Sequence, residues 1–225
     1  MAKPEQVFVG CPYTANTRKI YRRLKAELEA DTPLHFVFAD TATITSTDDL
    51  LEYITELIVD SACCIFDATG NNPNVSLEVG LAHALPVDFL ITLSTRKPRK
   101  AGTRRASGKP GPDPSRAIMA DLQGRTRIEY KAFRGLKEQV KKRYLSKLPY
   151  MTRWLEFEKN HKSYIPYALR LFAEIRSSGR TTAARVEAIL SGSGIPTTAL
   201  TEALTKKRLI TVRRGKNGGY FYPSK

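Results

Sequence analysis

The chain has 225 residues, which is enough for one large domain or two small ones. It has no run of 18 apolar residues and no apolar leader, so we expect a cytoplasmic protein without a membrane span. Its charge is uneven, because residues 1–95 hold 6 Lys/Arg and 13 Asp/Glu, whereas residues 96–225 hold 31 and 9. Such a basic second half favours a polyanionic partner, and nucleic acid is the commonest.

The cysteines and histidines give no sign of a metal centre. Cys11, Cys63 and Cys64 lie in or beside predicted strands, as reduced thiols do in a cytoplasmic protein. The three histidines are scattered without the spacing of metal ligands. We therefore predict no metal site, and we predict no cofactor.

The first two thirds of the chain alternates short apolar runs with helical periodicity. The runs predict strands at residues 6–10, 35–40, 62–66, 89–93 and 126–130. Apolar residues spaced three or four apart predict helices at about 18–29, 50–58, 77–85 and from 136 onward. This alternation predicts an α/β domain over residues 1–148, with a doubly wound, parallel five-stranded sheet.

Polar and small residues follow the predicted strands, at the sheet edge where ligands bind in open α/β folds. Gly10, Pro12 and Tyr13 follow the first strand, and Asp40 ends the second. The first loop lacks a G-x-G-x-x-G fingerprint, but backbone N–H groups at a helix start can hold a phosphate or a sugar hydroxyl. A packed surface aromatic is an equal interpretation for Tyr13.

The third strand ends at Asp67, and a loop of Gly, Asn and Pro leads into a helix that carries Glu78. Leu77, Val79 and Leu81 surround Glu78, so its carboxylate lies either at the rim of a cleft or buried at considerable cost. The plainer interpretation is an acid placed near the positive end of a helix dipole.

Two segments of this stretch match a known pattern: residues 67–75, Asp-Ala-Thr-Gly-Asn-Asn-Pro-Asn-Val, and residues 78–84, Glu-Val-Gly-Leu-Ala-His-Ala. They resemble the segment shared by nucleoside 2-deoxyribosyltransferase-like and bacterial TIR-like proteins, and the likeness covers roughly the first 95 residues. The resemblance implies a flavodoxin/TIR-like fold and a catalytic carboxylate at Glu78, which acts on the anomeric carbon of a ribose. It also implies supporting roles at the sheet edge, for Asp67 in catalysis and for these residues in ligand binding: Gly10, Pro12, Tyr13, Gly70, Asn72 and Asn74. Asp40 is a further ligand-binding candidate from its position alone, since it ends a strand at the same edge.

Residues 96–116 differ in composition from the predicted sheet, since they are rich in Lys, Arg, Gly and Pro. We expect a mobile basic loop there, either a solvated insertion or an arm over an anionic ligand or nucleic acid. Residues 149–163 are expected to form a helical connector that contains Trp154.

Residues 164–225 are expected to be a second unit. Helices are predicted near residues 167–175, 182–190 and 197–206, and strands at 209–213 and 220–223, which is the order of a winged helix-turn-helix. The hairpin sequence of residues 213–220, Arg-Arg-Gly-Lys-Asn-Gly-Gly-Tyr, resembles the wing of Rrf2-type repressors. Those repressors hold an iron–sulfur cluster on cysteines that this half lacks, so the resemblance implies DNA binding without cluster sensing.

The candidate DNA contacts divide into two sets. The exposed face of the third helix would present Thr198, Thr201 and Thr205 to the major groove. The hairpin cations Arg213, Arg214 and Lys216 would contact phosphates or enter the minor groove. A winged helix used for protein contacts is the alternative.

Two functions remain open on the sequence. One is a hydrolase or transferase that breaks an N-glycosidic bond of a nucleoside or nucleotide, NAD included, and is joined to a DNA-binding unit. The other is a transcription regulator that senses a nucleotide without chemistry. A third hypothesis, an interaction module with a degenerate first domain, is disfavoured by the intact Glu78. The expected partners are a nucleotide or nucleoside, double-stranded DNA and further copies of the same chain, with no membrane.

Overall fold

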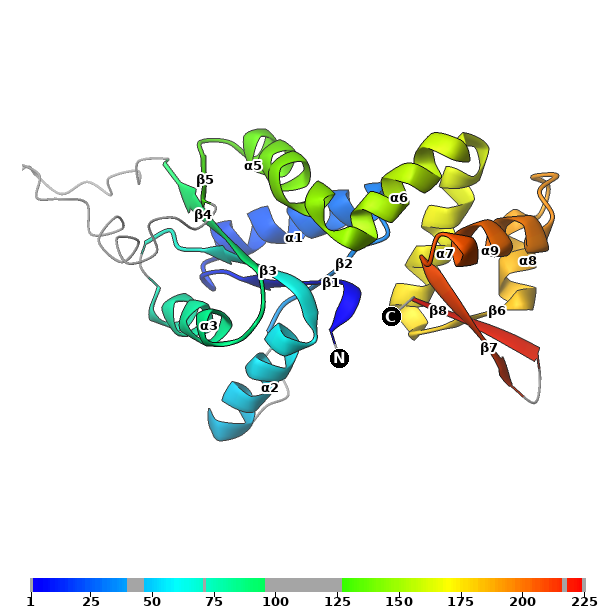
Figure 1. Ribbon diagram of the computed structural model, residues 1–225. Helices are drawn as coiled ribbons and strands as arrows, with labels where there is room; N and C mark the ends of the chain where they lie inside the picture. The colour runs from blue at the N-terminus through cyan, green and yellow to red at the C-terminus, as the bar shows by residue number, and fades with distance from the viewer. Residues whose placement is uncertain (1, 40–46, 71, 96–126, 216–217, 224–225) are drawn as a thin grey trace, which may run out of the picture.

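The computed structural model describes residues 2–39, 47–70, 72–95, 127–215 and 218–223 (Figure 1). Strands β1 (Lys3–Gly10), β2 (His35–Val37), β3 (Ser61–Asp67), β4 (Phe89–Ser94) and β5 (Arg127–Tyr130) pair in parallel in the order β2-β1-β3-β4-β5. This confirms the predicted α/β class with a parallel five-stranded sheet. β2 is shorter than predicted, and Asp40 lies outside the described residues.

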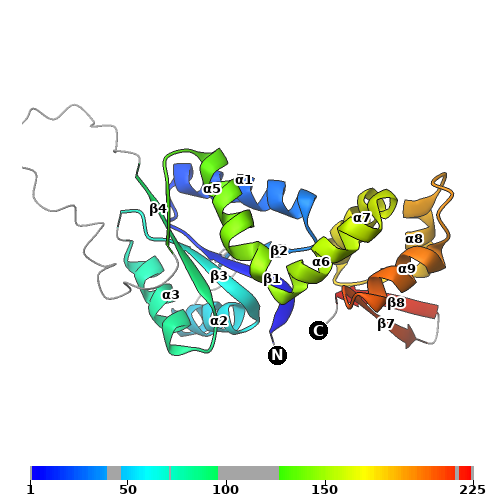
Figure 2. The same cartoon turned by 45° about the horizontal axis from the view of Figure 1, so that its top comes forward.

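Helices cover both faces of the sheet. Side chains alternate between the faces along each strand, and the apolar residues of the strands on both faces need to be buried. Helices α1 (Ala15–Asp31) and α5 (Phe133–Gln139) pack with Val7 and Val9, whereas α2 (Thr47–Val59) and α3 (Pro73–Ala84) pack with Phe8 (Figures 1 and 2). The two faces are built from separate clusters of buried apolar residues. The arrangement is that of a doubly wound fold.

The chain leaves the sheet through a continuous helical stretch. α5 passes into a π-helical turn, η2 (Val140–Tyr144), and a 3₁₀ turn, η3 (Leu145–Lys147), before α6 (Pro149–Asn160) and η4 (Lys162–Tyr164). Residues 149–160 and 162–164, within or beside the expected connector, are helical. They also supply core, since α6 buries Tyr150, Met151, Trp154 and Phe157.

The C-terminal part contains three helices and a small antiparallel sheet. Its elements are α7 (Ile165–Ser178), β6 (Thr181–Thr182), α8 (Ala183–Leu190), α9 (Thr197–Lys206), β7 (Ile210–Gly215) and β8 (Gly218–Pro223), and its strands pair in the order β6-β8-β7. Gly179 ends α7 in the left-handed conformation, with φ of 71°. The two-residue strand β6 was not predicted, and Pro196 is the N-cap of α9.

Polar contacts join the C-terminal part to the first part and to the connector. The guanidinium group of Arg176 on α7 donates to the backbone carbonyls of Glu29 (2.9 Å), Leu34 (3.2 Å) and Thr32 (3.4 Å). The Tyr150 hydroxyl donates to the carbonyl of Leu209 over 2.7 Å. Among the described helices, none is both long and apolar enough to cross a membrane.

Candidate functional site

The candidate site lies between β1 and β3, where the strand order β2-β1-β3-β4-β5 reverses its direction across the sheet. β1 and β3 are neighbours, with Gly10 aligned to Phe66, yet β1 leads to α1 on one face and β3 leads to α3 on the other. The loops after these strands therefore diverge and leave a crevice at the carboxyl edge, which is where open α/β sheets bind ligands.

Glu78 on α3 projects into this crevice. Its side chain is 5% exposed, and its Oε2 atom has no hydrogen-bond partner among the described residues. Burial raises the pKa of the Glu78 carboxyl to about 7. A carboxylate held this way is costly to the fold, and such groups gather at functional sites.

Gly10 makes the room that Glu78 occupies. A Cβ atom at position 10 would overlap the Glu78 carboxylate and lie 2.6 Å from the ring of Phe66. The strand end and the catalytic candidate are therefore in direct steric contact. Gly10 is needed for this close approach rather than for an unusual backbone angle.

The pocket around Glu78 is almost closed. Its volume is about 10 Å³, which suffices for about one water molecule. The Tyr13 hydroxyl donates to the carbonyl of Ala39, and the Arg18 guanidinium lies 5.0 Å from the centre of the Tyr13 ring. Tyr13 and Arg18 thus line the pocket and narrow it on the solvent side.

Cys11 is the other reactive group in the pocket. Burial raises the pKa of its thiol to about 12, and the charges of Asp67 and Glu78 act in the same direction. The thiol therefore stays protonated near neutral pH, and the thiolate is the nucleophilic form. Glu78 is the better candidate for a nucleophile here.

Asp67 does not line the Glu78 pocket. It is fully buried, with Oδ1 accepting from the backbone N–H of Thr69 (2.8 Å) and Oδ2 accepting from the Tyr130 hydroxyl (2.9 Å). Side-chain alternation along β3 directs Asp67 to the α1 face, whereas Glu78 comes from the opposite face. Asp67 therefore holds the loop after β3 in this structure, and its supporting role in catalysis stays a prediction.

The remaining loop residues have local structural roles. Asn72 caps α3, its Oδ1 accepting from the backbone N–H groups of Asn74 (3.0 Å) and Val75 (3.3 Å). Gly70 adopts φ of +80°, which favours glycine. Asn74 is exposed one helical turn before Glu78, so the two share a helix face, and Pro12 is buried beside Cys11.

The predicted DNA-contacting threonines do not all face outward. Thr198 and Thr205 on α9 are exposed, but Thr201 is 7% exposed and its hydroxyl donates to the carbonyl of Thr197 over 2.9 Å. The predicted exposure of Thr201 is wrong, because the buried side of α9 is wide enough to include it beside Leu200 and Leu204. The side chain of Arg214 and the whole of Lys216 lie outside what the structure describes.

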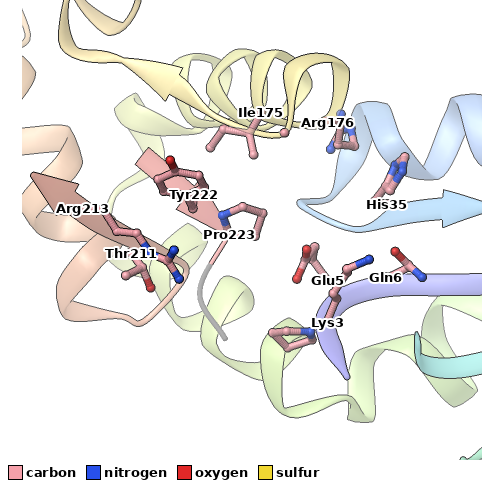
Figure 3. Close-up of a pocket in the computed structure, with 12 residues that line it drawn as sticks. Lys3, Glu5, Gln6, His35, Ile175, Arg176, Thr211, Arg213, Tyr222 and Pro223 are labelled. Carbon is pink, nitrogen blue, oxygen red and sulfur yellow. The ribbon is translucent and has the colours of Figure 1, made fainter. Parts of the chain in front are cut away.

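A larger cavity, of about 570 Å³, lies between the amino end of the sheet and the C-terminal part (Figure 3). Arg213, predicted to contact DNA, lines this cavity with its guanidinium 5.2 Å from the centre of the Tyr222 ring. Across the cavity, Glu5 has a buried Oε2 without a partner in the described chain, and burial raises the pKa of its carboxyl. This cavity is separate from the crevice, since it lies where β1 and β2 begin, at the opposite edge of the sheet.

Within the described ranges, no cluster of three or more His, Cys, Asp or Glu could hold a metal ion. No family model and no curated protein matches the chain. Among solved structures, a 2-deoxyribosyltransferase from Leishmania mexicana is similar, with 16% identity and a TM-score of 0.37, over 42% of this chain and 68% of its own. A similarity of that size carries no argument about activity, which must be inferred from the residues of the site.

Proposed function

We propose that the α/β part, residues 1–148, breaks or exchanges the N-glycosidic bond of a nucleoside or nucleotide, with Glu78 acting at the anomeric carbon. One observation carries this proposal: the Glu78 carboxyl is buried at the carboxyl edge of the sheet with an oxygen that no described group satisfies. A developing positive charge on a sugar ring is a partner that such a carboxylate would stabilise.

The chemistry follows that of retaining glycosidases. The Glu78 carboxylate attacks C1′ of the sugar, and the C1′–N bond breaks with its electron pair leaving on the base. Water, or a second base, then attacks C1′ of the glycosyl ester and frees Glu78. A base that is cationic in the substrate, such as nicotinamide, leaves as a neutral molecule and needs no acid to protonate it. This suits the Glu78 pocket, because the raised pKa of the Cys11 thiol makes it a poor proton donor.

The test is release of free base by the full chain from NAD, nucleotides and nucleosides, followed by chromatography. Glu78→Gln should keep the fold and lower base release by more than about a thousandfold, since it removes the reacting carboxylate. Glu187→Gln, an exposed change on α8, is the matched control and should be silent. If the unmodified protein releases no base from any of these compounds, the catalytic proposal fails.

We also propose that residues 164–225 form a winged helix-turn-helix that binds duplex DNA. Three features support it: the order of helices and strands, the exposed Thr198 and Thr205 on α9, and the excess of Lys/Arg in residues 96–225. In this arrangement α9 would enter the major groove.

The second candidate function is a nucleotide-sensing DNA-binding regulator without catalysis. The observation that favours it is the nearly closed Glu78 pocket, which a ligand would have to open by moving Tyr13. Ligand binding without base release, together with a change in DNA affinity, would support the regulator over the enzyme.

A further inference from the structure

The positive charges of the acidic first half are concentrated on one helix. Five of the six Lys/Arg in residues 1–95 lie on α1. Two of them are engaged by acids one turn later, Arg23 with Glu27 (2.7 Å) and Lys25 with Glu29 (3.2 Å). The other three, Arg18, Lys19 and Arg22, line an open cavity of about 490 Å³ together with Tyr13 and Ala15.

This cavity adjoins the pocket of Glu78. Tyr13 and Arg18 line both of them, and the charges of Arg18 and Arg22 reach Cys11, where they oppose the effect of Glu78 and Asp67 on the thiol. Arg18 therefore lines the pocket of the buried carboxyl that we propose acts on the sugar, and Lys19 and Arg22 line the cavity that adjoins it. The pocket is lined by Glu78, which is 5% exposed and whose Oε2 has no hydrogen-bond partner among the described residues, and this is an independent sign of a ligand.

Lys19 and Arg22 are exposed and form no ion pair with an acid in the described part of the chain. Cations grouped around a hollow, in a half-chain with more acids than bases, favour an anion in that hollow. A sugar held at Glu78 with its 5′ carbon toward Tyr13 and Arg18, which line both cavities, would place its 5′ substituent beside this group. Phosphate is the anionic substituent that nucleosides carry there.

We propose that the cavity of Arg18, Lys19 and Arg22 binds the 5′-phosphate or diphosphate of the substrate, so that the substrate is a nucleotide or dinucleotide rather than a free nucleoside. This inference rests on the proposed function for the position of the sugar. The binding of phosphate can be tested without it.

The experiment measures affinity by calorimetry on the full chain at about 0.15 M salt, with adenosine, AMP, ADP-ribose and inorganic pyrophosphate as probes. AMP and ADP-ribose should bind at least about tenfold tighter than adenosine. The double variant Lys19→Gln/Arg22→Gln should lower the affinity for the phosphorylated probes and for pyrophosphate by about tenfold or more, and leave that for adenosine unchanged. The control, Arg134→Gln/Lys142→Gln, removes the same charge from exposed positions of α5 and η2 and should change neither affinity.

The outcomes separate this inference from the proposed function. Equal affinity for AMP and adenosine, or an affinity for phosphorylated probes that the double variant leaves intact, overturns the phosphate site. Release of base from nucleosides and nucleotides at the same rate also overturns it, although the glycosidic activity would stand. Phosphate-dependent binding that the double variant weakens supports the site even where no base is released, and in that case catalysis alone fails.

Discussion

At the scale of single residues, Glu78 and Gly10 form one unit across two elements. The carboxyl reaches its buried position because position 10 has no side chain, and in that position its Oε2 meets no hydrogen-bond partner among the described residues. A larger residue at position 10 would therefore act on the site without touching the chemistry directly.

This steric contact predicts the effect of a single methyl group. Gly10→Ala should destabilise the fold by about 1–3 kcal/mol, since the Phe66 ring and the Glu78 carboxyl must both move. The matched control is Gly80→Ala on α3, where a Cβ meets no atom within 4 Å, and it should stabilise by about 0.5–1 kcal/mol. Urea unfolding of the two variants measures both effects. Equal stability of Gly10→Ala and the unmodified chain would show that the crevice is looser than described.

The sequence places both Glu78 and Asp67 at the carboxyl edge of the sheet, but it does not show which face of the sheet each acid comes from. A strand end and a helix start can be read from local apolar spacing, so both acids could be placed near the edge. The partner of Asp67, Tyr130, is 63 residues away and comes from the far side of β4. No local pattern records that pairing, nor does any show that the two acids approach from opposite faces.

At the scale of elements, the strands and helices follow the apolar patterns closely. The sequence predictions fail at β6, where the apolar run is too short to indicate a strand, and at Thr201, where the buried face of the helix is wider than its leucine stripe. β6 has two residues and forms through pairing with β8, 38 residues or more along the chain. Thr201 lies next to the Leu200–Leu204 stripe of α9, and the helix is buried on a face broad enough to cover it.

The burial of Thr201 predicts how the α9 threonines differ in DNA binding. Thr198→Ala should change the ratio of affinities for two duplex sequences by about fivefold, as loss of one base contact does, if α9 enters the major groove. Thr201→Val should leave that ratio unchanged, since its hydroxyl already donates within the helix. The full chain should also lose affinity with salt, with a log–log slope of about −0.9 per phosphate contacted. An unchanged ratio in Thr198→Ala, with duplex binding intact, would move the base contacts away from α9.

At the scale of the whole molecule, the two parts share packing rather than a free linker. α6 buries four large side chains in the same cluster that contains residues of β1 and of α9, and Arg176 ties α7 to the end of α1. α1 also carries the cations beside Glu78. A ligand that shifts α1 therefore acts on an element in direct contact with the C-terminal part, which is a physical route between the two proposed activities.

The measurement that tests the central claim most directly is the pH dependence of base release. Glu78 must be ionised to act at C1′, and burial holds the pKa of its carboxyl near 7 in the free protein. The kcat/KM for base release should therefore rise through about pH 7 and reach a plateau above it, because kcat/KM reports ionisations of the free enzyme when the substrate itself does not titrate in that range. The substrate is therefore NAD or a similar compound that has no group titrating near pH 7. A rate that rises instead near pH 4.5, or that is retained by Glu78→Gln, would contradict the account.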